Sequence, residues 1–359
     1  MPDTFINRIK AATRILLKGI PPERSSGDLY RQRSKIPAIS AEEVAEAKAF
    51  FPLEKFFIFG HARSGTTLLT RLIRLHPEVH CNYQAHFFTR APFLHTLVAD
   101  PEVAAWLSQR SNRWNRGQDL SPVVLRAVSD FILEREARRV GKPIIGDKSP
   151  NNTVGGEAVR NLHAVYPDAY LIFIVRDGRD AVLSHRFQDF VDRMDSLSPA
   201  DARLREEFTR QPEPFLTGQH SLFSENRLRL EALSWAKNLA ETEALGKSLF
   251  GLRYIHLRYE DLLAKPWDEL CRVWKFLQTV DYTDVEALGS ELEAIVAAEM
   301  QSNPDAEWQM QKDRELAHVL QKGQRGNWQK ILPARDRAIF KEAAGQALID
   351  WQYETSFDW

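Results

Sequence analysis

Short apolar runs alternate along this chain with longer segments in which apolar residues recur at helical spacing. Residues 55–59, 170–175 and 253–257 are mainly apolar and of strand length, and residues 143–146 are a further candidate. Strands that are covered on both faces of a parallel sheet are apolar throughout and do not alternate with polar residues. The pattern therefore predicts at least four buried strands.

The intervening segments have apolar residues every three or four positions, which is typical of helices. Ser40 and Glu43 match a capping box, and Pro122 occupies a first helical position. The predicted helices cover residues 41–50, 66–75, 121–140, 156–166, 180–187, 226–247, 266–277, 284–300 and 335–349. Strands that alternate with helices predict an α/β fold, in which a mostly parallel sheet is flanked by helices on both faces. The carboxyl ends of such strands share one edge, where functional sites of this architecture lie.

Composition excludes several classes of protein. The chain has 359 residues, with 27% charged and 43% hydrophobic residues and a net charge of −1, so it is neither disordered nor strongly basic. Nothing in this balance favours a nucleic-acid partner. The only two cysteines, Cys81 and Cys271, are too few for a disulfide scaffold or a cysteine-built metal site. With no signal peptide and no membrane-spanning run in the sequence, we expect a cytoplasmic protein.

The N-terminal segment differs from the rest of the chain. Residues 1–38 contain eight Lys or Arg and three acidic residues, and the apolar residues between positions 5 and 20 recur at helical spacing. One interpretation is a helix over residues 1–20 that contacts an anionic membrane surface. The other is a helix that packs against the body of the protein. We predict a basic helix and linker over residues 1–40 and a single domain over residues 41–359.

A glycine-punctuated segment lies between the first predicted strand and its helix. Gly60 and Gly65 allow a tight turn and close backbone approach. Successive amides that lead into a helix N-terminus bind anions, and the hydroxyls of Ser64, Thr66 and Thr67 add donors. The segment therefore predicts a phosphate-binding loop.

The loop has the G-x-x-x-x-G spacing of nucleotide phosphate loops, but its next residue differs. Nucleoside triphosphatases place Lys after the second glycine, and this chain has Thr66 there. The strong cation of the loop is Arg63, which lies inside it. A cation inside the loop suits a ligand with a short terminal group near its 5′-phosphate better than one with a triphosphate tail.

Two further segments carry phosphate-type chemistry. Arg176 follows a buried strand, where its guanidinium can bind phosphate in a bidentate manner, and Ser184 lies eight residues further on. The alternative is an exposed turn in which Arg179 and Asp180 are solvated. Near the C-terminus, residues 322–328 place two glycines and two cations beside Trp328.

Together these segments resemble the sulfotransferases that use 3′-phosphoadenosine 5′-phosphosulfate (PAPS). Residues 63–67 match the family's [KR]-[ST]-G-[TS]-[TS] motif, residues 176–184 match its R-D-x-x-x-x-x-x-S motif, and residues 322–328 match its K-G-x-x-G-[DN]-W motif. The loop is most similar to the tyrosylprotein and bacterial branches. The resemblance implies a P-loop-like nucleotide fold with a helical insertion on the acceptor side. It also implies that the following residues bind PAPS: Arg63, Ser64, Gly65, Thr66, Thr67, Arg176, Ser184, Lys322 and Gly323.

Two weaker matches extend the predicted site. Tyr259 begins a Y-E-D-L block that the family also has, and it lies either near the adenine or in the core behind an acidic cap. Lys148 lies in a segment similar to a K-x-P block of the tyrosylprotein branch, where the Lys faces the sulfonate. The alternative for Lys148 is an exposed charged turn.

The resemblance implies that PAPS transfers its sulfuryl group to a hydroxyl acceptor. Positioning and charge stabilisation are expected to dominate, with Arg63 and Lys148 as catalytic residues and no metal required. Gln84 occupies the position of the catalytic Glu of the tyrosylprotein branch and cannot act as a base. We therefore predict His86 as the general base, followed by His80 and His61, although a structural role for His86 or an already ionised phenol are alternatives.

The acceptor pocket is expected in two long connecting segments, residues 81–118 and 186–226. Aromatic residues of the first segment line one wall of this pocket or fill a small helical subdomain: Phe87, Phe88, Phe93, Trp106 and Trp114. The acceptor is a small molecule, carbohydrate, lipid or peptide hydroxyl. Two other functions stay open: a P-loop kinase or NTP-binding protein, and a non-catalytic nucleotide-binding scaffold.

Overall fold

The computed structural model describes residues 36–109, 113–192, 197–277, 282–302 and 325–359. The described chain contains two compact units. One includes His95–Leu125, and the other holds Ala38–Leu94 and Arg126–Trp359, which contain the whole sheet. Residues 1–35 of the predicted basic segment lie outside the described residues, so its helix and its membrane contact stay predictions.

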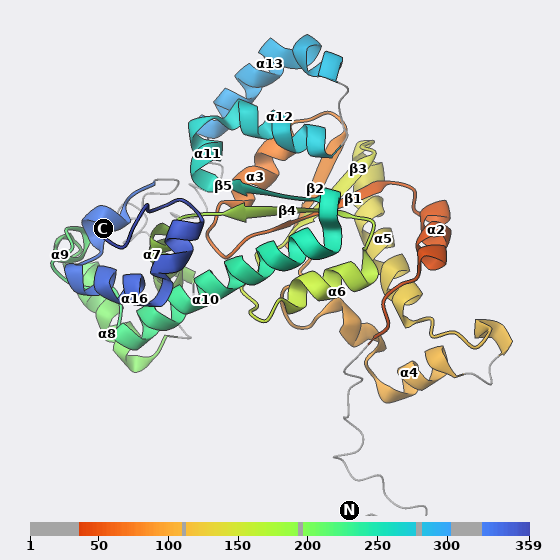
Figure 1. The fold of residues 1–359 in the computed structure, drawn as a ribbon, viewed down its shortest axis with the longest axis horizontal. Helices are drawn as coiled ribbons and strands as arrows, with labels where there is room; N and C mark the ends of the chain where they lie inside the picture. The colour runs from red at the N-terminus through yellow and green to blue at the C-terminus, as the bar shows by residue number, and fades with distance from the viewer. Residues whose placement is uncertain (1–35, 110–112, 193–196, 278–281, 303–324) are drawn as a thin grey trace, which may run out of the picture. The chain divides into compact units, whose positions relative to one another are not determined.

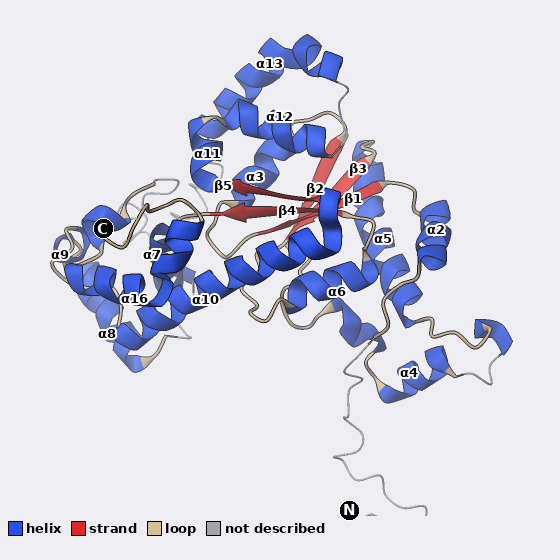
Figure 2. Ribbon diagram, viewed as in Figure 1, coloured by secondary structure: helices blue, strands red, loops and turns tan. Residues whose placement is uncertain are grey.

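Five parallel strands form one sheet (Figures 1 and 2). They are β1 (Glu54–Phe59), β2 (Val79–Tyr83), β3 (Ile144–Lys148), β4 (Tyr170–Val175) and β5 (Tyr254–Arg258), in the order β2-β3-β1-β4-β5. The predicted α/β fold with a parallel sheet is confirmed. Because all strands run in the same direction, their carboxyl ends and the segments that follow them share one edge.

The sequence did not indicate β2, and the reason is its place in the sheet. This strand is at the edge, and its residues alternate between buried Val79 and Cys81 and half-buried His80 and Asn82. A search for uniformly apolar runs finds strands that are covered on both faces and overlooks such an edge strand.

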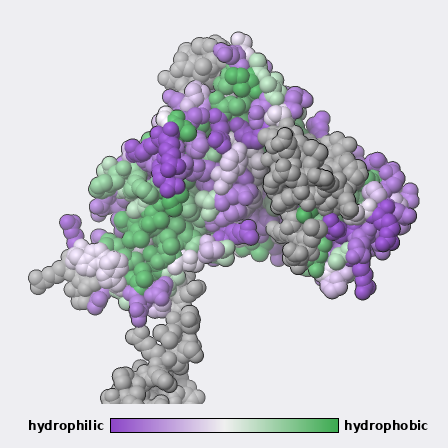
Figure 3. Space-filling model, turned by 180° about the vertical axis from the view of Figure 1, so that it is seen from behind, coloured by the Kyte–Doolittle hydropathy of each residue, from purple (hydrophilic) through white to green (hydrophobic). Residues whose placement is uncertain are grey.

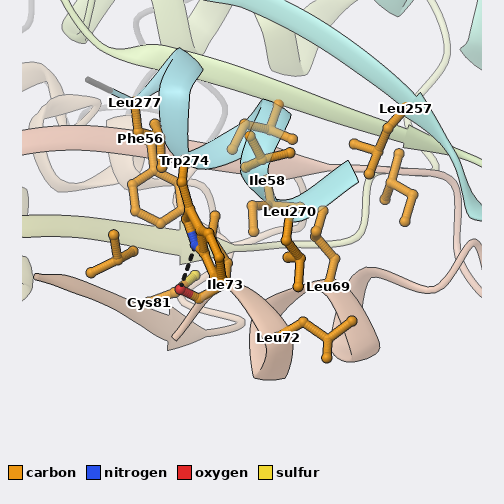
Figure 4. Packing of buried hydrophobic residues seen from close by; sticks show 14 of the residues in the cluster. Phe56, Ile58, Leu69, Leu72, Ile73, Cys81, Leu257, Leu270, Trp274 and Leu277 are labelled. Carbon is orange, nitrogen blue, oxygen red and sulfur yellow. Dashed lines mark hydrogen bonds between the residues drawn. The ribbon is translucent and has the colours of Figure 1, made fainter. Parts of the chain in front are cut away.

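One face of the sheet packs on α3 (Thr66–Ile73), α11 (Tyr259–Ala264) and α12 (Pro266–Phe276) (Figure 1). Phe56 and Ile58 point into this layer and are fully buried. The indole nitrogen of Trp274 donates to the carbonyl of Ile73 at 3.2 Å, as the dashed line in Figure 4 shows. This bond joins α12 to the last turn of α3, the helix that follows the phosphate loop.

The opposite face is covered by α6 (Glu157–Val165) and α10 (Glu225–Leu245) (Figure 1). Successive side chains of a strand point to opposite faces, so Phe57 faces this layer. Its ring lies 4.9 Å from that of Tyr166 and 5.8 Å from that of Phe88. Both faces of the sheet are therefore covered, as predicted from strands that are apolar throughout.

The predicted helices are present with shifted ends. The remaining α-helices are α2 (Ala41–Phe50), α4 (Pro101–Ser108), α5 (Ser121–Val140), α7 (Gly178–Asp192), α8 (Pro199–Arg210), α9 (Glu213–Leu216), α13 (Tyr282–Gln301), α15 (Trp328–Ile331) and α16 (Ala334–Asp350). The capping box forms between Ser40 and Glu43. Residues 186–226, expected as a long connecting segment on the acceptor side, are largely helical, because α7 extends to Asp192 and α8 and α9 follow. Ser198 caps α8, and Pro199 occupies its first position.

A buried ionic network attaches α5 to the amino end of β1. The Lys55 ammonium lies 2.7 Å from Glu134 and 3.5 Å from Asp130, and all three side chains are at most 2% exposed. The Arg126 guanidinium pairs with Asp130 at 2.7 Å and with Asp168 at 2.6 Å. The network therefore lies at the end of the sheet opposite the phosphate loop.

Polar and apolar residues are unevenly distributed on the surface. The face seen in Figure 3 carries a continuous apolar area among polar surroundings. Among the described helices, α5 exposes the most large hydrophobic side chains: Val128, Phe131, Ile132 and Val140. Within the described residues, no helix combines the length and the apolar character that a membrane crossing needs.

Candidate active site

The loop between β1 and α3 requires glycine at two positions. A Cβ on Gly60 would lie 2.7 Å from the carbonyl oxygen of Ile174. Gly65 has a φ of +88°, and a Cβ there would lie 2.2 Å from the ring of Tyr259. Arg63 also adopts a left-handed conformation, with a φ of +70°. The backbone thus passes close to Ile174 and Tyr259 just before the N-terminus of α3.

The hydroxyls of this loop suit an anion. The Ser64 side chain is fully buried, and its oxygen has no hydrogen-bond partner among the described residues. A buried hydroxyl without a partner is uncommon in a native protein unless a ligand or water satisfies it. Thr66 is 5% exposed and begins α3, whose dipole also favours a negative charge.

The structure brings the first two predicted motifs into direct contact. The Arg63 Nε donates to the Ser184 hydroxyl at 3.0 Å, and an Arg176 Nη donates to the Arg63 carbonyl at 2.9 Å. Arg176 leaves the end of β4, and Ser184 lies on α7. Arg63 therefore lies beside a guanidinium and a hydroxyl, those of Arg176 and Ser184, that are more than 100 residues away from it in the sequence.

Tyr259 packs against both parts of this arrangement. Its ring touches Gly65 and lies 4.9 Å from the guanidinium of Arg176. Burial raises the pKa of its hydroxyl. The residue supports the phosphate loop, whereas its predicted contact with adenine stays a prediction.

Lys148 lies at the end of β3 and is not part of an exposed turn. Its side chain is 1% exposed, so that alternative interpretation was wrong. The ammonium donates to the Thr67 hydroxyl at 3.3 Å and lies 5.2 Å from the centre of the Tyr83 ring. A cation is thus held at the first turn of α3, on the other side of the loop from Arg176.

Asp147, which sequence reasoning did not single out, holds the segment with the candidate base. Its carboxylate accepts from the Ala85 amide at 3.0 Å and from the Ser149 hydroxyl at 2.6 Å. The Ser149 oxygen accepts in turn from the His86 amide at 2.9 Å. Burial raises the pKa of Asp147 to about 6. Since β2 and β3 are paired up to Tyr83 and Lys148, this cluster continues the sheet edge beyond the strands.

His86 sits in an unusual backbone segment. Gln84 and His86 have φ values of +57° and +53°, and the Gln84 amide donates to the Lys148 carbonyl at 2.7 Å. The His86 Nδ1 lies 2.8 Å from the Thr89 hydroxyl. Burial, followed by the charges of Arg90 and Lys148, lowers the pKa of His86. The imidazole is therefore neutral at neutral pH, as a proton acceptor requires.

The two other candidate bases are in different environments. His61 is buried, and burial together with His185 lowers its pKa to about 4. Its Nδ1 lies 3.3 Å from the Ala62 carbonyl. His80 is half-buried on β2, where its Nε2 contacts the Asn82 side chain at 3.1 Å. His61 and His86 both follow the carboxyl end of a strand, β1 and β2 respectively, but His61 is buried whereas His86 is half-buried, so the position of His86 is more compatible with an acceptor.

Only part of the late motif is described. Lys322 and Gly323, predicted to bind the nucleotide, lie outside the described residues. The following turn is attached to the second motif, because the Asp180 carboxylate accepts from the amides of Gly326 at 2.6 Å and Trp328 at 3.0 Å. Asp180 is 2% exposed, and burial raises its pKa.

The interpretation of residues 176–184 as an exposed turn was wrong. Arg179 is 1% exposed, and its guanidinium lies 3.6 Å from the centre of the Trp328 ring. The two acidic residues in the R-D-G-R-D sequence could have indicated such a structural role, since buried arginines require carboxylate partners.

The aromatic residues assigned to the acceptor side divide between the two compact units. Phe88 is buried in the core against Phe57 and Tyr166, so its placement in a pocket wall was wrong. Trp106 and Trp114 stack on each other at 5.1 Å within the unit that includes residues 95–125.

One group of described side chains has the composition of a metal site. His185, Asp189 and Glu231 place one ligand atom each within 4.8 Å of one another. Arg227 already pairs with both carboxylates. The prediction that the reaction requires no metal stays a prediction.

Comparisons with known proteins relate this chain to sulfotransferases. A family model described as "Sulfotransferase family" matches residues 55–284, which include β2 to β5 and all of β1 except its first residue. Protein-tyrosine sulfotransferase A of Caenorhabditis elegans is 30% identical over 180 residues, which are 45% of this chain and 44% of that protein. Protein-tyrosine sulfotransferase of Drosophila melanogaster is 33% identical over 132 residues, 36% of this chain and 24% of that protein. The chain thus spans less than half the length of these curated relatives.

Solved structures also resemble this chain at low sequence identity. Mouse sulfotransferase SULT7A1 complexed with PAP has a TM-score of 0.44 and 17% identity, over 88% of this chain and 94% of that one. Retinol dehydratase in a complex with retinol and PAP has a TM-score of 0.42 and 15% identity, over 86% of each chain.

Proposed function

Because the family model matches well over half of its length, this chain belongs to the sulfotransferase family, and we propose that it transfers a sulfuryl group from PAPS to a hydroxyl acceptor. The observation that carries the proposal is the meeting of Arg63, Arg176 and Ser184 beside the buried Ser64 hydroxyl. These residues supply charge and donors for two separated phosphate groups.

The two ends of the nucleotide would be bound by different elements. The loop over residues 63–67 and the N-terminus of α3 would hold the 5′-phosphosulfate. Arg176 and Ser184 would hold the 3′-phosphate, and Lys322 and Gly323 would close over it. The contact between Arg176 and the Arg63 carbonyl supports this arrangement, because it joins a residue predicted to bind one phosphate to the loop predicted to bind the other.

The reaction forms a bond between sulfur and the acceptor oxygen and breaks the bond between sulfur and the bridging phosphate oxygen. Arg63 and Lys148 would stabilise the negative charge that grows on this leaving oxygen. His86 would accept the acceptor's proton, which its neutral imidazole permits. The product is adenosine 3′,5′-bisphosphate.

The acceptor is proposed only as a class. The two curated relatives are protein-tyrosine sulfotransferases, which supports a phenolic hydroxyl as the first acceptor to test. Carbohydrate, lipid and small-molecule hydroxyls are further candidates. A cytoplasmic location and a reaction without metal belong to the same proposal.

Binding measurements distinguish this proposal from an NTP-dependent enzyme. Calorimetric titration with adenosine 3′,5′-bisphosphate should give tight binding, whereas ATP with magnesium should bind weakly, since Thr66 stands where NTPases have Lys. Binding of ATP alone would refute the sulfotransferase proposal. Binding of the bisphosphate without transfer from labelled PAPS to any hydroxyl would instead indicate a non-catalytic scaffold.

The Arg63→Ala variant tests the catalytic assignment. We expect turnover to fall by roughly a hundredfold or more, while nucleotide binding falls much less, because Arg63 acts mainly on charge that develops in the transition state. Arg139→Ala, which removes an exposed arginine on α5, is the matched control. Unchanged turnover of the Arg63→Ala variant would remove this residue from the mechanism.

A further inference from the structure

We infer that Tyr353 and Glu354, in the segment after α16, are positioning residues that orient Arg176 toward the nucleotide's 3′-phosphate. The inference rests on the proposed function, in which Arg176 binds that phosphate. Neither residue belongs to the motifs on which the family resemblance rests. Asp177 is the residue directly after Arg176. Tyr353 is connected to it through the side chain of Glu260, and Glu354 is connected to it through the side chain of Arg179.

The peptide unit between Arg176 and Asp177 is held on both sides. The Trp235 indole donates to the Arg176 carbonyl at 3.2 Å. The Asp177 amide donates to the Glu260 carboxylate at 3.0 Å. A Cβ on Gly178 would lie 2.5 Å from the Trp235 ring, so the chain passes this indole closely. The direction in which Arg176 leaves β4 therefore depends on these bonds.

The first connection runs from Tyr353 through Glu260 to the Asp177 amide. Its hydroxyl donates at 2.9 Å to the Glu260 oxygen that does not bind the Asp177 amide. Burial raises the pKa of Glu260. A buried carboxylate needs donors on both oxygens to keep one orientation, and Tyr353 supplies the second donor.

Glu354 holds the second connection. It pairs with the Arg179 guanidinium, which also binds the Asp177 carboxylate at 2.7 and 2.9 Å. The guanidinium packs against two indole rings, 3.6 Å from the centre of Trp328 and 4.5 Å from that of Trp359. The C-terminal segment thus determines the position of Arg179, and Arg179 that of Asp177.

Both connections end at Asp177, one at its backbone amide and the other at its side chain. Glu260 binds the amide of Asp177, and Arg179 binds its side chain. Loss of either connection removes one of the contacts that hold Asp177, and we expect it to change the direction of the Arg176 side chain. If the C-terminal segment only closed the core, its loss would weaken the binding of every adenine nucleotide alike.

Two nucleotides that differ only in the 3′-phosphate separate these possibilities. Dissociation constants of adenosine 3′,5′-bisphosphate and adenosine 5′-monophosphate are measured by calorimetry on the full chain. The variants are Tyr353→Phe, Glu354→Gln and the double variant. Tyr254→Phe is the matched control, because this tyrosine also donates to a carboxylate, that of Glu243, but lies at the amino end of β5. Melting temperatures monitor folding.

We expect each single variant to lower the preference for the bisphosphate over the monophosphate by about threefold to tenfold, as the loss of one hydrogen bond implies. Monophosphate binding should change less than twofold, and the control should keep the wild-type preference. An unchanged preference in both single variants, or equal weakening of both nucleotides, would overturn the inference. A wild-type protein without any preference for the bisphosphate would refute the proposed function itself, and the inference with it.

Discussion

Individual buried side chains have pKa values that depart from those in solution. Burial lowers the pKa of His61 and of His76 to about 4, and it raises that of Asp147 to about 6. His76 accepts from the Glu78 amide at 3.2 Å through Nδ1, so protonation there would break a hydrogen bond. The three groups titrate in the same acidic range but with opposite effects on stability.

The two histidines should make the protein less stable in acid. Their pKa is lower in the folded than in the unfolded chain, so unfolding takes up protons between about pH 6.5 and 4, and the free energy of unfolding falls as the pH falls. At pH 5 the loss from His76 is about 2 kcal/mol. Denaturant titrations at pH 7.5 and 5 should therefore show a smaller loss for His76→Gln than for the wild type. An identical loss in both proteins would contradict the assignment.

Asp147 should have the opposite effect on the stability of the protein in acid. Its pKa is raised on folding, so it stabilises the folded chain as the pH falls through about 6. The Asp147→Asn variant lacks this contribution, and its stability should fall more steeply in acid than that of the wild type. The same denaturant titrations measure both effects.

The proposed role of His86 as general base can be tested by substitution of His86 and of Gln84. If His86 is the base, His86→Ala should lower kcat by roughly a hundredfold or more with a neutral acceptor hydroxyl. The fall in kcat should be smaller for an acidic phenol, because such a phenol loses its proton more readily without a base. A normal rate for His86→Ala would reject the assignment, and a large loss for Gln84→Ala would point to a role of the amide instead.

At the scale of elements, the turn from β1 into α3 depends on close packing as well as on backbone conformation. Gly65 and Gly141 both have positive φ, but a Cβ on Gly65 would penetrate the Tyr259 ring, whereas one on Gly141 would have nothing within 4 Å. Gly141→Ala should therefore cost about 1–2 kcal/mol of stability from strain alone. Gly65→Ala should cost roughly 1–3 kcal/mol more and weaken nucleotide binding. Equal losses in thermal or denaturant unfolding would contradict the role of Tyr259.

The elements that sequence analysis predicted best are those with a strong local signal. Residues 170–175 are apolar throughout, and Ser40 with Glu43 marks a helix start; both elements are present as expected. The edge strand β2 and the helices α8 and α9 were missed. Their side chains meet water on one face, so their composition resembles that of a polar loop.

At the scale of the whole molecule, the ionic network around Lys55 fixes α5 to the sheet. Removal of one member of a buried network leaves a charge without compensation, which typically costs about 3–5 kcal/mol. Lys55→Met should therefore lower the free energy of unfolding by this amount, since it leaves Glu134 and Asp130 without that cation. The double variant Lys55→Met with Glu134→Gln should recover part of the loss. A loss below about 1 kcal/mol would indicate that the network is not needed for stability.

The sequence by itself determined the chemistry that is available: a glycine-rich loop with Arg63 after a buried strand, a second arginine after another strand, and no lysine at the position that NTPases use. These are local features, because they depend on residue types at fixed spacing. Only the tertiary structure decided that Arg176 meets the Arg63 carbonyl, that Asp147 holds the His86 segment, and that Asp180 holds the turn at Gly326. Such contacts join segments far apart in the chain. They arise because parallel strands bring their carboxyl ends to one edge, and which residues meet there depends on strand order and packing, which no local pattern contains.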